Sequence, residues 1–151
     1  MRRLLIVYHS QGGRTTRMAE AVLRGAQREA GIEVVCQRAF DTALEDLLAC
    51  NGLIIGTPEN FGYMSGAVKD FFDRTYYPAE GKTGGLPYAL FISAGNDGSG
   101  AVREIGRIVK GYGWQLVADA VVARKDVDED ALAACEALGE AMATGLALGV
   151  F

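Results

Sequence analysis

The residues best suited to bind a ligand lie near the start of the chain, in the run Ser10-Gln11-Gly12-Gly13-Arg14-Thr15-Thr16. Before them, Leu4–Val7 is an unbroken apolar quartet, which is typical of a strand buried on both faces. After them, residues 17–28 place apolar side chains at helical spacing. A glycine-containing turn between a strand and a helix aims N–H groups and hydroxyls at one point, where the helix dipole favours negative charge. The sequence therefore predicts a phosphate-binding loop.

Two further polar segments follow apolar runs in the same way. Pro58–Gly62 follows Leu53–Thr57, and Ser93–Gly98 follows Tyr88–Ile92. The carboxyl ends of neighbouring parallel strands meet at one edge of a sheet, and ligands bind there where the strand order reverses. We therefore expect all three loops to form one site.

The elements that must position these loops alternate along the chain. Apolar runs predict five strands at residues 4–7, 32–38, 53–57, 88–92 and 114–122, and helical spacing predicts five helices between and after them. This alternation predicts an α/β fold, a three-layer sandwich in which helices cover both faces of a five-stranded parallel sheet of order 2-1-3-4-5. We expect residues 1–151 to form a single domain.

Local signals set several expected boundaries. Gly31 is the expected stop of the first helix, and Thr42-Ala43-Leu44-Glu45 has the form of a capping box. Ser65 and Asp128 are expected N-caps. Residues 76–86 are expected to form a polar excursion.

Composition excludes several classes of function. A net charge of −4 gives no support for nucleic-acid binding, and one histidine without an acidic cluster predicts no metal site. No apolar run approaches the ~20 residues that a membrane span needs. Three widely spaced cysteines, Cys36, Cys50 and Cys135, indicate free thiols. We expect a cytoplasmic protein without a membrane span.

Taken together, the motifs give the chain a family resemblance. Ile6–Ser10 with Gly13 and Thr15, Gly56–Ser65, Lys69–Arg74 and Gly95–Gly100 resemble the flavodoxin-like flavoproteins. The resemblance is closer to the branch of NAD(P)H-dependent FMN reductases and WrbA-type quinone reductases. It extends over almost the whole chain.

This resemblance implies FMN as the cofactor, NAD(P)H as the electron donor and a quinone or similar small molecule as the acceptor. It also implies a homo-oligomer, a dimer or a tetramer, and no side chain with an acid–base role. The alternative is a flavodoxin-type electron carrier without its own substrate turnover. The cofactor-binding residues that it implies are Ser10, Gln11, Gly12, Gly13, Arg14, Thr15, Thr16, Pro58, Glu59, Asn60, Phe61, Gly62, Ser93, Ala94, Gly95, Asn96, Asp97 and Gly98.

The sequence departs from these relatives in three places. The first loop has Gln11-Gly12-Gly13-Arg14 where electron carriers usually have a Thr-Gly-Asn-Thr-like turn. The third loop, Ala94–Gly100, lacks the aromatic residue that commonly stacks on their flavin. The chain also lacks the insertion that WrbA-type enzymes carry after the fourth strand.

Simpler interpretations of several residues stay open. Ser10 and Thr15 are also ordinary cap residues, and Arg14 is either an anion partner or a solvated first-turn residue. His9 is favoured as a packed strand-end side chain over a general acid. Phe61 and Tyr63 either anchor their loop or contact the flavin or substrate. Tyr76 and Tyr77 are candidates for an interface or for the rim of the substrate site.

Overall fold

The computed structural model describes all of residues 1–151 and confirms the predicted fold. Every strand pair is parallel, in the order β2-β1-β3-β4-β5, and a sixth strand, β6, also pairs with β4. The strands are β1 (Arg2–Tyr8), β2 (Ile32–Arg38), β3 (Gly52–Pro58), β4 (Pro87–Ala94), β5 (Gln115–Leu116) and β6 (Val121–Arg124). The helices are α1 (Arg14–Ala26), α2 (Leu44–Ala49), α3 (Gly66–Ala79), α4 (Ser99–Tyr112) and α5 (Glu129–Leu148), and a 3-10 turn spans Ala39–Asp41.

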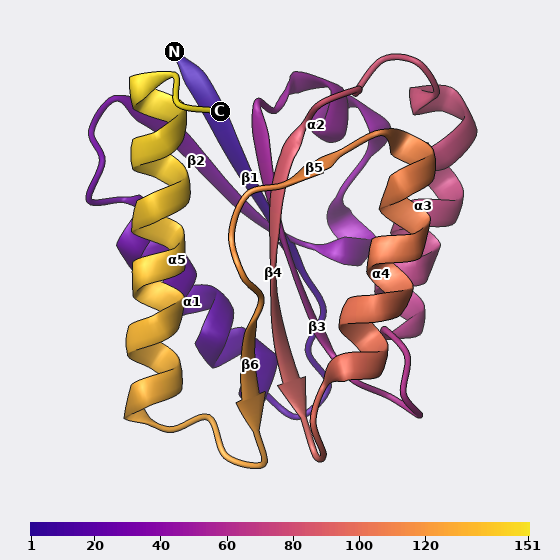
Figure 1. The fold of residues 1–151 in the computed structure, drawn as a ribbon, viewed down its shortest axis with the longest axis vertical. Coiled ribbons are helices and arrows are strands. Elements are labelled where there is room, and N and C mark those ends of the chain that lie inside the picture. Colours follow the sequence, from indigo (N-terminus) through magenta and orange to yellow (C-terminus); the bar gives the residue numbers. More distant parts are fainter.

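Helices cover both faces of the sheet (Figure 1). Side chains of α2, α3 and α4 pack on one face, and those of α1 and α5 pack on the other. Successive residues of a strand point to opposite faces, so Leu5 and Val7 enter the first core while Leu4 and Ile6 enter the second. All four are fully buried, which is why this strand reads as a continuous apolar run.

Helices α1 and α5 pack with their backbones in contact, because each carries a glycine at the contact. A Cβ at Gly25 would lie 1.9 Å from the carbonyl oxygen of Glu136, and one at Gly139 would lie 2.0 Å from that of Val22. By length and composition alone α5 is apolar enough to cross a membrane. Its stripe of Cys135, Leu138, Met142 and Leu146 is buried against the sheet and α1, and core helices of this kind meet the same criterion.

The cap predictions are confirmed at two helices and wrong at two. Ser65 Oγ accepts from Val68 N, and Asp128 Oδ1 accepts from Ala131 N. Helix α1 ends at Ala26 rather than Gly31, with Gln27 N donating to the carbonyl of Leu23.

The predicted capping box at Thr42 is shifted by one residue. Helix α2 starts at Leu44 after Ala43, whose N–H donates to Asp46 Oδ2 at 2.8 Å. The Thr42 hydroxyl instead donates to the carbonyl of Arg38, which holds the preceding 3-10 turn. Competition by this local hydrogen bond is why the motif failed as a boundary signal.

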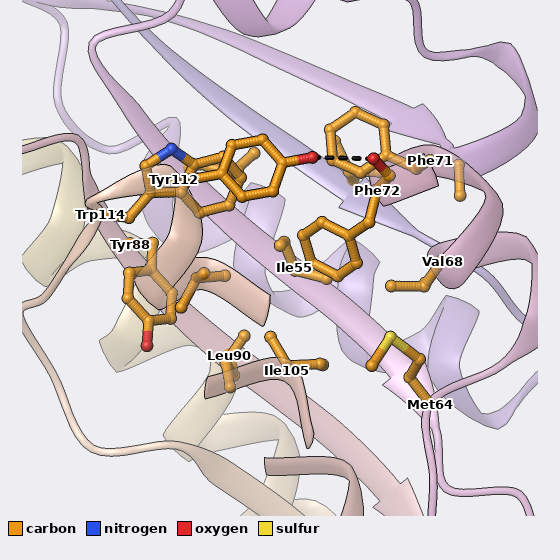
Figure 2. Packing of buried hydrophobic residues seen from close by; sticks show 14 of the residues in the cluster. Ile55, Met64, Val68, Phe71, Phe72, Tyr88, Leu90, Ile105, Tyr112 and Trp114 are labelled. Atoms are coloured by element: carbon orange, nitrogen blue, oxygen red, sulfur yellow. Dashed lines mark hydrogen bonds between the residues drawn. The ribbon is translucent and has the colours of Figure 1, made fainter. Parts of the chain in front are cut away.

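The predicted polar excursion over residues 76–86 is also wrong at its start, because α3 continues to Ala79. Tyr76 lies edge-on to Tyr112 of α4 with ring centroids 5.0 Å apart, and this packing extends the helix past the polar sequence signal. The Tyr112 hydroxyl donates to the carbonyl of Phe72, the hydrogen bond drawn in Figure 2. It also forms a hydrogen bond with the Thr75 hydroxyl. The contact fixes α3 against α4.

The predicted strand over residues 114–122 is broken into β5 and β6. Leu116 pairs with Tyr88 and Val121 pairs with Phe91. The outer chain therefore uses five residue steps where β4 uses three, and the surplus must leave the sheet. Figure 1 shows the chain curving away from β4 between β5 and β6. This is a bulge, a feature that periodicity does not reveal.

Candidate cofactor site

A polar cavity of about 270 Å³ lies where β1, β3 and β4 end. The structure thus brings together the three loops that the sequence predicted to meet. Ten residues line the cavity, none of them hydrophobic and all of them among the expected ligands: Ser10, Gln11, Gly12, Arg14, Thr15, Pro58, Glu59, Asn60, Ser93 and Gly95.

The first loop is held open by Ser10. Its Oγ accepts from Gly13 N at 3.1 Å and from Thr16 N at 3.2 Å. Gly13 has a φ of 93°, a left-handed conformation that glycine adopts without strain, and no atom lies within 4 Å of where its Cβ would be. The next two N–H groups, those of Arg14 and Thr15, have no protein acceptor. The start of α1 therefore presents free donors and a positive dipole end.

Arg14 places a cation at this helix end. Its Nη2 reaches the carbonyl of Ala94 at 3.4 Å, while its Nε is buried without a hydrogen-bond partner. A cation at a helix N-terminus is unfavourable on its own, and a buried donor without an acceptor is costly. An anion bound in the cavity would relieve both costs.

Thr15 is buried, and its Oγ1 lies 2.8 Å from Ser93 Oγ. This hydrogen bond ties the first turn of α1 to the end of β4. Its hydroxyl therefore serves the scaffold, in a contact with β4 that neither the ligand role nor the cap role indicated by sequence describes, and the residue also lines the cavity.

The second loop turns sharply at Phe61 and Gly62, with φ values of 54° and 72°. Asn60 and Tyr63 exchange two main-chain hydrogen bonds across this turn, and the Phe61 side chain at its tip is fully exposed. A left-handed conformation at a phenylalanine is uncommon and concentrates at ligand-binding turns. The fold thus presents an aromatic ring at the carboxyl edge of the sheet without burying it.

Side chains connect the second loop to the other two. Asn60 Nδ2 donates to Gln11 Oε1 at 2.9 Å, and Glu59 Oε2 accepts from Ala101 N at 3.0 Å. A Cβ at Gly100 would lie 2.1 Å from the carbonyl oxygen of Gly62, so the loop packs directly on α4. Sequence reasoning missed this role of Glu59. The available signal was that Gly98, which precedes α4, has no side chain with which to cap it.

The third loop contains no aromatic side chain, as the sequence indicated. Asp97 Oδ1 accepts from the N–H and the hydroxyl of Ser99, and these hydrogen bonds hold the pKa of the Asp97 carboxyl below its ordinary value. Gly98 has a φ of 74° where α4 begins. The remaining predicted ligands belong to the same three loops but do not line the cavity: Gly13, Thr16, Phe61, Gly62, Ala94, Asn96, Asp97 and Gly98.

His9 lies at the end of β1, edge-on to Phe40 with ring centroids 5.8 Å apart. Burial, and secondarily the positive charge of Arg38, lower the pKa of its imidazole. No hydrogen bond joins its side chain to the cavity, which agrees with a packed side chain at a strand end.

The donor set fits the phosphate monoester of FMN. Free N–H groups at a helix start, an unpartnered guanidinium nitrogen and two glycines with open space where a Cβ would stand all suit an anion approached closely by backbone. The polar lining suits the phosphate and polyol end of the cofactor. The Phe61 ring is fully exposed on the second loop and would be free to contact a flavin ring.

Comparison with known proteins agrees with this geometry. The Flavodoxin family profile matches residues 6–139. A flavodoxin of Aquifex aeolicus is 31% identical over 99% of this chain and 90% of its own length.

An NAD(P)H dehydrogenase (quinone) of Acidithiobacillus ferrooxidans is 32% identical over 66% of the chain, which spans 60% of that protein. The crystal structure of a flavodoxin, WrbA-like protein from Agrobacterium tumefaciens superposes with a TM-score of 0.78 at 22% identity, covering 99% of both chains. The profile match, which extends over most of the sheet and all three loops of the site, identifies this chain as a member of the flavodoxin family of FMN proteins.

Proposed function

We propose that this flavodoxin-family protein is an oxidoreductase that passes electrons from NAD(P)H through FMN to a quinone or similar small acceptor. The observation that carries the proposal is the third loop, where Ala94–Gly100 provides no aromatic side chain. A nicotinamide must lie face to face with the flavin at a separation of about 3–3.5 Å. A tyrosine or tryptophan stacked from this loop would occupy that position.

Bound FMN supplies the two-electron chemistry, and the chain supplies binding and orientation. Ser10 fixes the first loop through its bonds to Gly13 N and Thr16 N, and the free N–H groups of Arg14 and Thr15 would hold the phosphate. The Arg14 guanidinium adds a charge-assisted donor. Glu59 and Asn60 hold the second loop against its two neighbours. No acid–base role is assigned to any of these side chains.

Reduction of the FMN-loaded protein by NADH and by NADPH tests the proposal. The flavin absorbance band is followed after anaerobic mixing, and a quinone is then added in excess. We expect bleaching at a rate that supports turnover and reoxidation by the quinone. Replacing Asn96 with tyrosine, which adds the missing aromatic residue at an exposed loop position, should slow reduction more than it weakens FMN binding.

A second candidate function is that of a flavodoxin-type electron carrier. It is favoured by the Aquifex aeolicus flavodoxin, whose likeness extends over nearly the whole chain. A carrier would bind FMN equally well but would be reduced by NAD(P)H too slowly for turnover. That result, with rapid reduction by dithionite as the control for an intact site, would favour the carrier.

We also propose a homo-oligomer, a dimer or a tetramer. Two exposed aromatic side chains are candidates for a subunit interface: Phe61 at the tip of the second loop, and Tyr77, which is 78% exposed near the end of α3 remote from the cofactor cavity. Light scattering on the FMN-loaded protein tests this. A monomer at micromolar concentration would contradict the proposal without affecting the assignment of the cofactor site.

A further inference from the structure

The largest cavity in the molecule lies away from the cofactor site, between α4 and the outer strands of the sheet. Its volume is about 620 Å³, within the range of sites that bind small organic molecules, and it shares no lining residue with the cofactor cavity. We call it the α4 groove. Its lining residues are Tyr88, Leu90, Val102, Arg103, Gly106, Arg107, Val109, Lys110, Trp114, Leu116, Asp119 and Ala120.

The groove adjoins the break in the last strand. Because Leu116 pairs with Tyr88 and Val121 with Phe91, the residues between β5 and β6 leave the sheet edge. Two of these residues, Asp119 and Ala120, form one wall of the groove. Bulges that open a sheet edge in this way are over-represented beside binding sites.

The floor of the groove is apolar and largely aromatic. Tyr88 and Leu90 come from β4, and Trp114 precedes β5; Figure 2 shows all three on the α4 side of the sheet. Leu116 is 53% exposed at the margin, so part of this apolar surface faces water. The Trp114 indole N–H is bonded to Thr83 Oγ1, and its ring, which is 8% exposed, packs on Tyr112 and Tyr88 and presents only its edge to the groove.

The rim on the α4 side is cationic. Arg103, Arg107 and Lys110 line the groove at helical spacing, and Asp119 is the only carboxylate in the lining. Glu104 lies 3.7 Å from Arg103 and 3.3 Å from Arg107, whereas Lys110 forms no ion pair. Three cations against two carboxylates, Glu104 and Asp119, leave the rim with a net positive charge on a chain whose net charge is −4.

Gly106 keeps this groove open. It lies inside α4, where glycine is the poorest residue after proline. Other glycines inside helices have a steric reason: added Cβ atoms at Gly25, Gly111, Gly139 and Gly145 would lie within 3 Å of other groups. A Cβ at Gly106 would meet nothing within 4 Å. The helix therefore has no packing reason for glycine here, and the missing side chain leaves the space empty.

From these observations we infer that the α4 groove binds a small aromatic carboxylate. The aromatic body lies on Tyr88, Leu90 and Trp114, and the carboxylate meets Lys110 and Arg107 at the rim. An apolar floor beside an unpaired cation selects for a ligand that has both parts. This site is separate from the electron-transfer function proposed above and stands without it.

Titration of the FMN-loaded protein with 2-naphthoate, followed by amide chemical shifts in NMR, tests the inference. We expect saturable shifts at Gly106, Lys110, Leu116 and Asp119. Lys110→Gln should weaken binding at least tenfold, and Gly106→Leu should abolish it by filling the groove. Arg28→Gln, which removes a cation from the turn after α1 on the opposite face, should bind within about threefold of wild type.

Three outcomes would overturn the inference. The first is that the neutral analogue 2-naphthalenemethanol binds with the same affinity as 2-naphthoate, which would show that the cations do not contribute to binding. The second is shifts confined to the loops around Gly12 and Gly62. The third is wild-type affinity in a Gly106→Leu protein whose spectrum shows the native fold.

Discussion

Two glycines of α4, Gly100 and Gly106, show that the cofactor cavity and the α4 groove are formed in different ways. At Gly100 the helix is in contact with the second cofactor loop, and an added Cβ would lie 2.1 Å from the Gly62 carbonyl oxygen. At Gly106 the helix borders an open groove, and an added Cβ would touch nothing. The cofactor cavity is shaped by close packing between loops, whereas the α4 groove is shaped by a missing side chain. The same residue type therefore has opposite consequences six positions apart.

The largest effect is expected at the polar cavity. Ser10→Ala combined with Arg14→Gln removes the acceptor that orders the first loop and the cation that faces the ligand. Loss of hydrogen bonds to a charged group should weaken the binding of FMN by about 3 kcal/mol. The binding free energy of riboflavin, which lacks the phosphate, should change much less. Fluorescence titration measures both affinities. An equal loss of affinity for the two ligands would contradict the assignment of this loop to the phosphate.

Alanine at the two α4 glycines tests the comparison directly. Gly100→Ala forces backbone apart at the loop contact and should destabilise the fold by about 1–3 kcal/mol. Gly106→Ala should instead stabilise it by up to about 1 kcal/mol, because alanine is the better helix former and nothing obstructs it. Urea unfolding gives both values. Loss of stability in both variants would show that Gly106 is packed against other groups.

The link between the second loop and α4 is expected to have a smaller effect. Glu59→Ala removes the carboxylate that accepts from Ala101 N and should destabilise the protein by about 1 kcal/mol, the usual cost of a lost helix cap. Glu59→Gln keeps an acceptor oxygen and serves as the matched control. Thermal unfolding of the two variants compares them. Equal loss in both would mean that charge at the helix start, rather than the hydrogen bond, is what Glu59 provides.

Sequence patterns were sufficient for the sheet order and for the meeting of three loops, because buried parallel strands and glycine-containing turns leave local signals. They were insufficient where two distant segments decide the outcome. Tyr76 is helical because it packs on Tyr112, and the strand after Trp114 breaks because its register on β4 changes by two residues. Glu59 was expected near the cofactor, but its hydrogen bond to Ala101 depends on a contact over 42 positions. Pairings of this kind appear only after the chain has folded.

The smallest effect is expected from His9, beside the cofactor cavity at the end of β1. Burial first, and the charge of Arg38 second, lower its pKa in the folded protein below the ordinary value of 6.5. The unfolded chain therefore binds more protons than the folded one just below pH 6.5, so stability falls as the pH falls through that value towards the lower folded pKa. His9→Gln, which cannot be protonated, should flatten this part of the profile while leaving stability above pH 7 nearly unchanged. Urea unfolding between pH 5 and pH 8 measures the slope. An unchanged slope in the variant would assign the pH dependence to other groups, and a slope of opposite sign in the wild-type protein would mean that the folded state favours the charged imidazole.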